Sequence, residues 1–167
     1  MSSASEPRVD RGLALGRELV RVHDWLRTEL DRIGTELDSG AFDGAEELVP
    51  LRTHCVAFCD ALTRHHTSED AFAFPVLAGE LPELAPVLEQ LSQDHQLVAE
   101  ILGRLRQLLA EVTPETVESV RGEIDGLRAI LESHFRWEER KLTDALDRLV
   151  TARDAAELFG LSAQPLR

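Results

Sequence analysis

The sequence predicts an all-α fold: an antiparallel up-down four-helix bundle with a short C-terminal helix. Four long segments carry apolar residues at alternating spacings of three and four, and none shows the alternation of a β-strand. The chain of 167 residues has no tyrosine, only seven prolines and ten glycines, which is a composition that favours helices. A chain of this length can bury one hydrophobic core, so we expect a single bundle domain.

Short breaks divide the chain into the expected helices. We expect the bundle at residues 10–149, between a flexible N-terminus at 1–9 and a short helix and tail at 150–167. The helical period places the individual helices, with an error of about two to four residues at each end, at 9–38, 44–78, 83–111 and 114–149, with a short helix near 152–160.

Residues at the breaks suit the ends of these helices. Gly40 suits the C-terminal cap of the first helix, and Asp43 suits the N-cap of the second. Pro50 requires either a kink or a second helix that starts near 49, because proline has no backbone N–H. Two further prolines close the second helix and separate it from the third. Thr113, followed by Pro114, suits the N-cap and first residue of the fourth helix.

A histidine interrupts the apolar stripe of each long helix near its middle. Alternating spacings of three and four are typical of helices that pack as a four-helix bundle and cross at about 20°. In the second helix the inward stripe continues past its polar residues to Phe72 and Val76, and in two helices a glutamate follows the histidine by four residues. The interrupting side chains are His23, His65, Glu69, His95, His134 and Glu138.

These six side chains predict a metal site in the core. Short connections make neighbouring helices antiparallel, so the central positions of all four lie at a similar depth. A buried carboxylate without a partner costs several kcal/mol or is forced neutral, and a buried imidazole needs a hydrogen-bond partner. A pair of divalent or trivalent cations removes this cost, because carboxylates can bridge two ions. Histidine with carboxylate suits iron or manganese better than zinc.

Two further histidines differ in their positions relative to the stripe. His54 lies one position off the stripe and about 16 Å along the helix from His65, so we expect it at the rim or the surface. His66 lies beside the stripe, next to two candidate ligands. The sequence leaves three roles open for it: an additional ligand, a group that hydrogen-bonds to a ligand, or an exposed imidazole.

Four acidic residues each adjoin a candidate ligand in the sequence. Such carboxylates could orient imidazoles on other helices, and the alternative is simple exposure to solvent. These residues are Asp24, Asp70, Asp94 and Glu139.

Cys55 and Cys59 lie four residues apart, on one side of a helix, in neither a C-x-x-C nor a zinc-knuckle arrangement. We expect buried free thiols, with a redox role as the alternative.

Charge and hydropathy exclude several classes of partner. A formal net charge of −13 would repel phosphate backbones and anionic lipids, so we expect neither nucleic-acid binding nor binding to membrane surfaces. The sequence contains no apolar run near the roughly 20 residues that span a bilayer, and its start lacks the apolar segment of a signal peptide. We therefore expect a cytoplasmic protein.

In their order along the chain, these motifs resemble the hemerythrin-like, or HHE cation-binding, domains. The resemblance covers about residues 10–149. It implies a four-helix bundle around a non-haem centre of two iron ions, with manganese or zinc less suited, in which the two glutamates bridge the irons. It rests on His23 in VHDWLRTEL, His65 and Glu69 in HHTSEDAFAFP, His95 in QDHQLVAEIL, and His134 and Glu138 in HFRWEERKL.

The chain departs from the oxygen-carrying hemerythrins at two positions. Those proteins have a second histidine four residues after the one in the third helix, where this chain has Ala99, and they have aspartate in place of Glu138. Both irons would then keep open or water-filled positions unless His66 fills one. The resemblance implies a protein that binds dioxygen, nitric oxide or peroxide in a binding, sensing or storage role. The alternatives are a diiron enzyme that degrades peroxide or reduces nitric oxide, and an iron-responsive sensor or interaction module.

Overall fold

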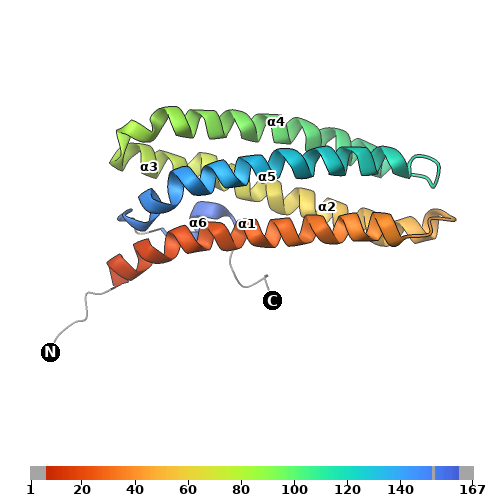
Figure 1. The fold of residues 1–167 in the computed structure, drawn as a ribbon, viewed down its shortest axis with the longest axis horizontal. Coiled ribbons are helices and arrows are strands. Elements are labelled where there is room, and N and C mark those ends of the chain that lie inside the picture. The colour runs from red at the N-terminus through yellow and green to blue at the C-terminus, as the bar shows by residue number, and fades with distance from the viewer. Residues whose placement is uncertain (1–6, 152, 162–167) are drawn as a thin grey trace.

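The computed structural model describes residues 7–151 and 153–161, and this part of the chain is helical throughout its regular elements (Figure 1). Four long helices form the bundle, and three short helical segments connect the second of them to the third. The elements are α1 (Pro7–Ser39), α2 (Ala45–Ser68), the π-helical segment η1 (Glu69–Ala73), α3 (Phe74–Glu80), the 3₁₀ segment η2 (Pro82–Leu84), α4 (Ala85–Ala110), α5 (Val117–Asp147) and α6 (Ala155–Phe159).

The expected up-down bundle is confirmed. Helix α1 packs against α2 and α5, and α4 packs against the same two helices on the other side. Successive long helices run in opposite directions, with the α1–α2 and α4–α5 connections at one end of the bundle (Figure 1). The expected short C-terminal helix is α6, which packs against α1, α2 and η1.

The observed helix ends differ from the predicted ones at three places. Helix α1 already includes residues 7–9, and residues 1–6 lie outside the described residues, so for those six the flexible N-terminus stays a prediction. Asp43 is not the N-cap of α2, because Gly44 takes that position in an extended conformation without a side-chain cap. Thr113 does not cap α5 either, since residues 113–116 form a separate turn in which the Thr116 hydroxyl accepts the Thr113 N–H.

Pro50 lies inside α2, so the alternative of a start near 49 is wrong. It is the sixth residue of the helix, and its missing N–H removes the bond that the Glu46 carbonyl would otherwise accept. Both residues are exposed, so water can satisfy that carbonyl.

The π-helical turn η1 changes which residues of this helix face the core. Its wider turn bonds the Phe74 N–H to the carbonyl of Glu69, five residues back, which advances the inward face by one residue. The predicted inward residue Phe72 is therefore 36% exposed, and Val76 is only partly buried. Ala73 and Leu77 take their places in the core.

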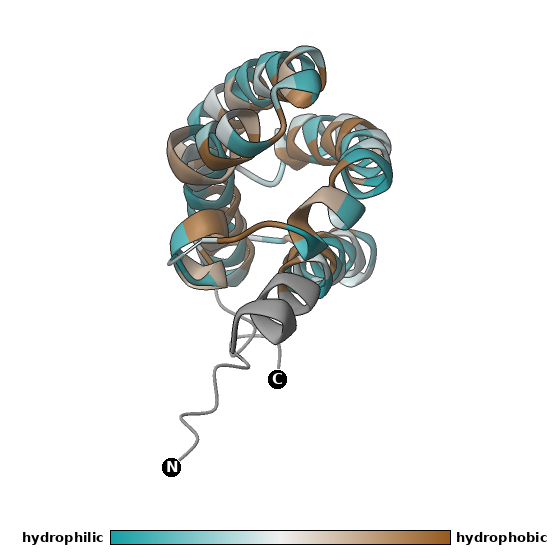
Figure 2. Cartoon of the chain, turned by 90° about the vertical axis from the view of Figure 1, so that its left-hand side faces the viewer, coloured by the Kyte–Doolittle hydropathy of each residue, from teal (hydrophilic) through white to brown (hydrophobic). Residues whose placement is uncertain are grey.

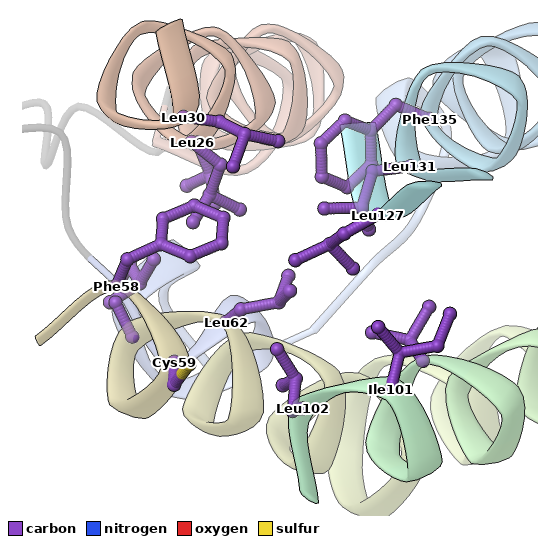
Figure 3. Packing of buried hydrophobic residues seen from close by; sticks show 14 of the residues in the cluster. Leu26, Leu30, Phe58, Cys59, Leu62, Ile101, Leu102, Leu127, Leu131 and Phe135 are labelled. Carbon is purple, nitrogen blue, oxygen red and sulfur yellow. The ribbon is translucent and has the colours of Figure 1, made fainter. Parts of the chain in front are cut away.

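Apolar side chains fill the bundle on both sides of its polar middle. Figure 2 shows the hydrophobic parts of the helices turned toward a common interior, with hydrophilic residues outside. Leucine and phenylalanine side chains from all four long helices meet there, among them Leu26, Phe58, Leu102 and Leu131 (Figure 3). None of the described helices is long and apolar enough to cross a membrane.

Both cysteines lie in this core as free thiols. Burial raises the pKa of Cys55 to about 12 and that of Cys59 to about 11. At neutral pH both side chains therefore behave as small apolar groups, as the sequence predicts.

We predict that an aromatic disulfide reagent at pH 8 modifies neither Cys55 nor Cys59 in the folded protein, because the thiolate is the reactive form. The rate should be at least about a hundredfold below that of an exposed cysteine. In denaturant both thiols should react within minutes. Rapid modification of either thiol without denaturant would contradict this assignment.

Candidate metal centre

The six predicted side chains meet in one buried layer across the bundle. His23 comes from α1, His65 from the last turn of α2, His95 from α4, and His134 from α5. The two carboxylates are contributed by η1 and α5. All six side chains are buried, and His66, for which the sequence left three roles open, is buried with them.

The donor atoms fall into two adjoining groups, in each of which they all lie within 4.8 Å of one another. One group has three imidazoles and the other has two imidazoles and two carboxylates. We call them the three-histidine group, which is His66, His95 and His134, and the two-histidine group, which is His23, His65, Glu69 and Glu138.

Glu69 lies between the two groups. Its Oε1 is 3.4 Å from Nε2 of His65 in one group and 3.4 Å from Nε2 of His95 in the other. The second carboxylate approaches the first helix instead, with Oε2 of Glu138 lying 2.7 Å from Nε2 of His23. The two groups are thus close enough for one carboxylate to reach both.

The imidazoles are oriented by hydrogen bonds at their outer nitrogens. Nδ1 of His23 pairs with Glu139, at 2.7 Å. Nδ1 of His95 pairs with Asp70, at 3.0 Å. In each pair the acid lies next to a candidate ligand on a different helix. Each carboxylate therefore keeps the proton at Nδ1. The unprotonated Nε2 points inward, where its lone pair can bind a cation.

The same arrangement holds for His134, whose Nδ1 lies 3.0 Å from a carboxylate oxygen of Asp94 on α4. Three of the four candidate orienting acids therefore pair with imidazoles on other helices. For Asp24 the alternative holds, because it is exposed to solvent and pairs with Arg27 one turn along its own helix at 2.9 Å.

The orienting group of His65 was not found from the sequence. Its Nδ1 donates to the backbone carbonyl of Phe159 in α6, at 2.8 Å and in a buried position. Any residue type supplies a backbone carbonyl, so no side-chain pattern could point to Phe159. Only the docking of α6 on α2 brings the two together.

His66 belongs to the centre by its position. Its ring stacks on that of His95 with the centroids 3.9 Å apart and the planes 11° apart, and it meets His134 edge-on at 5.3 Å. Burial, together with the neighbouring His95, lowers the pKa of His66 well below its usual value. A stacked pair of rings is compatible with a neutral His66, whose Nε2 can serve as a donor to a cation.

His54 lies away from the centre, as predicted. Its Nδ1 is 3.1 Å from Glu36 and its Nε2 is 3.5 Å from Glu29, and the side chain is partly exposed. Its hydrogen bond is with Glu36, and neither of its nitrogens belongs to a donor group.

Nine inward-facing atoms have no hydrogen-bond partner among the described residues. They are Nε2 of His23, His65, His66, His95 and His134, and both carboxylate oxygens of Glu69 and Glu138. The 2.7 Å approach of Glu138 to His23 lacks the alignment of a hydrogen bond. In a native core nearly all buried polar atoms have a hydrogen-bond partner. Nine unpaired nitrogens and oxygens that point at one place therefore call for a bound group.

The pKa shifts of the buried residues also favour a bound cation. Burial and the nearby Glu138 raise the pKa of Glu69 well above its usual value. Burial alone would lower the pKa of His23, but the contacts with Glu138 and Glu139 raise it. Burial lowers the pKa of His65 to about 3. Burial alone would raise the pKa of Glu138, but His23 and its other neighbours lower it. Without a cation Glu69 therefore holds a proton beside an ionised Glu138, at a position where a cation would bind.

The residues therefore fit a metal centre. Neutral imidazole nitrogens and carboxylate oxygens are ligands for transition-metal cations, and here they converge from four helices with their outer atoms already hydrogen-bonded. The arrangement has two groups with a shared carboxylate, which can hold one cation or a pair.

Comparison with known protein families gives one match. The model of the hemerythrin HHE cation-binding domain matches residues 15–146, which is most of the chain and all of the candidate ligands. Comparisons with curated proteins and with solved structures gave no match.

We predict that Asp70→Ala lowers the affinity for Fe²⁺ by about 10- to 100-fold, because the Nδ1 of His95 loses the acceptor that orients its ring. Asp24→Ala is the matched control, since Asp24 also adjoins a candidate ligand but contacts no imidazole. Competition with a chelator measures both affinities. Equal losses in the two variants would show that the carboxylates do not act through the imidazoles.

We also predict that His66→Ala lowers the metal content of the purified protein and that His54→Ala leaves it unchanged, because only His66 lies in a donor group. Elemental analysis of both variants after the same iron loading measures this difference. If His66→Ala retains as much metal as His54→Ala, His66 is not a ligand.

Proposed function

Because the chain belongs to the hemerythrin HHE cation-binding domain family, we propose that its core holds two iron ions and binds dioxygen or a related small molecule at this centre. The observation that carries the proposal is the pair of adjoining donor groups with Glu69 between them. Nitric oxide and peroxide are the related ligands. The role is binding, sensing or storage of the small molecule.

The donor chemistry supports iron. Five imidazole nitrogens and four carboxylate oxygens face the centre, and the thiols of Cys55 and Cys59 belong to neither group. Imidazole with carboxylate is a ligand set for non-haem iron, whereas structural zinc takes four ligands in a closed tetrahedron. Seven side chains exceed what one tetrahedral ion needs, so they support a pair of ions with higher coordination numbers.

The unequal donor groups support binding of an external ligand. His66, His95 and His134 give one side of the centre three imidazoles and no carboxylate of its own, whereas the other side has two imidazoles and two carboxylates. An iron ion with fewer protein ligands keeps coordination positions open for a small molecule. When loaded, the centre would supply the redox chemistry of iron. The protein contributes fixed imidazoles and a buried space that excludes bulk water.

A pocket of about 180 Å³ between α2 and α4 leads toward the three-histidine group. His66 and His95 form part of its lining, with the hydroxyl side chains of Thr63 and Thr67 beside them. Ala99 also lines the pocket, and its small side chain leaves space where the oxygen-carrying relatives have a histidine. Several water-sized molecules fit in such a volume, at about 30 Å³ each.

The proposal predicts about two iron ions per chain after anaerobic loading, because each donor group holds one, and an absorption spectrum of the reduced protein that changes when dioxygen is admitted. Elemental analysis and absorption spectroscopy measure both. Glu69→Ala should reduce the iron content and abolish the spectral change, while Glu111→Ala, just past the C-terminal end of α4, should alter neither.

Colourless protein without iron, unaffected by reduction and air, would contradict the proposal. Catalytic turnover of peroxide or nitric oxide by the loaded protein, lost in Glu69→Ala, would replace the binding role with an enzymatic one at the same centre.

A further inference from the structure

The C-terminal helix α6 lies outside the family match, which ends at residue 146, yet it contacts the metal centre directly. It packs against α1, α2 and η1 near the end of the bundle away from the α1–α2 connection (Figure 1). Leu158, Phe159 and Leu161 are buried there. The segment is thus part of the core although the matched domain ends before it.

Its contact with the centre is a hydrogen bond between backbone and ligand. Phe159 is the last residue of α6, and its carbonyl accepts the N–H at Nδ1 of His65 at 2.8 Å. Carbonyls in the last turn of a helix lack partners within the helix, so this one is free to accept. The bond fixes the tautomer that turns Nε2 of His65 toward Glu69.

Several features hold α6 in this place. The Asp154 carboxylate caps the helix by accepting the Glu157 N–H at 2.9 Å, and the Arg153 guanidinium lies 4.5 Å from the centre of the Phe72 ring on η1. Gly160 ends the helix with φ of 73°, in the left-handed region.

Gly160 also allows a close approach to α2. A Cβ at this position would lie 2.5 Å from the carbonyl oxygen of Arg64 and 2.6 Å from the Ser68 hydroxyl. Any other residue would therefore be strained in its backbone and would push α6 away from α2. The position of the Phe159 carbonyl depends on this glycine.

We propose that the docking of α6 and metal binding are coupled through the bond between Phe159 and His65, so that the C-terminal segment acts as a metal-dependent clamp on the two-histidine group. The inference rests on the proposed function. A cation at Nε2 makes the N–H at Nδ1 a stronger donor, which strengthens its bond to the carbonyl. Coupling is reciprocal, so undocking of α6 weakens metal binding by the factor by which metal stabilises docking.

Amide hydrogen exchange of the full-length, unaltered chain with and without Fe²⁺ tests the coupling. The reporting amides are Leu158, which donates to Asp154, and Gly160, which donates to Ala156. Gly40, which donates to Glu36 at the far end of α1, is the internal reference. We expect Fe²⁺ to slow exchange at the two α6 amides by at least about tenfold more than at Gly40. An equal effect at all three amides, or none at α6, would overturn the proposal.

The reciprocal experiment measures the Fe²⁺ affinity of Gly160→Ala by chelator competition, with Gly122→Ala as the control because a Cβ there meets nothing within 4 Å. We expect the first variant to bind at least about tenfold more weakly and the control to match the unaltered chain. Equal affinities would overturn the proposal. Should Gly160→Ala fail to fold, the exchange experiment decides alone. Iron binding without these effects refutes the clamp only, whereas no iron binding refutes the proposed function.

Discussion

The structure depends on one constraint: five imidazoles and two carboxylates are buried in an apolar bundle, where neither a free charge nor an unpaired polar atom is stable. The outer nitrogens of four imidazoles meet this constraint through hydrogen bonds within the protein. The inner atoms do not, and they converge on one place. Cations there would satisfy them together, which is why the core can keep these polar residues where leucines would otherwise pack.

The outer hydrogen bonds also tie the helices to one another. η1 holds the histidine of α4 through Asp70, α4 holds that of α5 through Asp94, and α5 holds that of α1 through Glu139. By the same pattern a carboxylate on α1 would accept a hydrogen bond from His65 on α2, but Asp24 on α1 faces solvent. The carbonyl of Phe159 takes its place. The geometry of the centre and the register of the helices are therefore set by the same contacts.

Much of this could be predicted from the sequence, because the positions of the six candidate ligands follow from the spacing of apolar residues on four helices. Which side chains face the core after Glu69 could not be predicted, because the π-helical turn leaves no mark on the periodicity of the sequence. This turn directs Phe72 outward. Nor could Asp24 be told from Asp70, since both adjoin a candidate ligand and only the rotation of each helix decides which carboxylate meets an imidazole. The role of His66 also depended on how the helices pack, because this packing stacks its ring on that of His95.

In the proposed function the two donor groups hold two separate cations, with Glu69 between them. A crystal of the iron-loaded protein, measured with X-rays just above the iron absorption edge, tests it most directly through anomalous scattering. We expect two peaks, one at Nε2 of His66, His95 and His134 and the other at Nε2 of His23 and His65, each also in contact with a carboxylate. A single peak, or none within reach of these nitrogens, would contradict the arrangement of two cations.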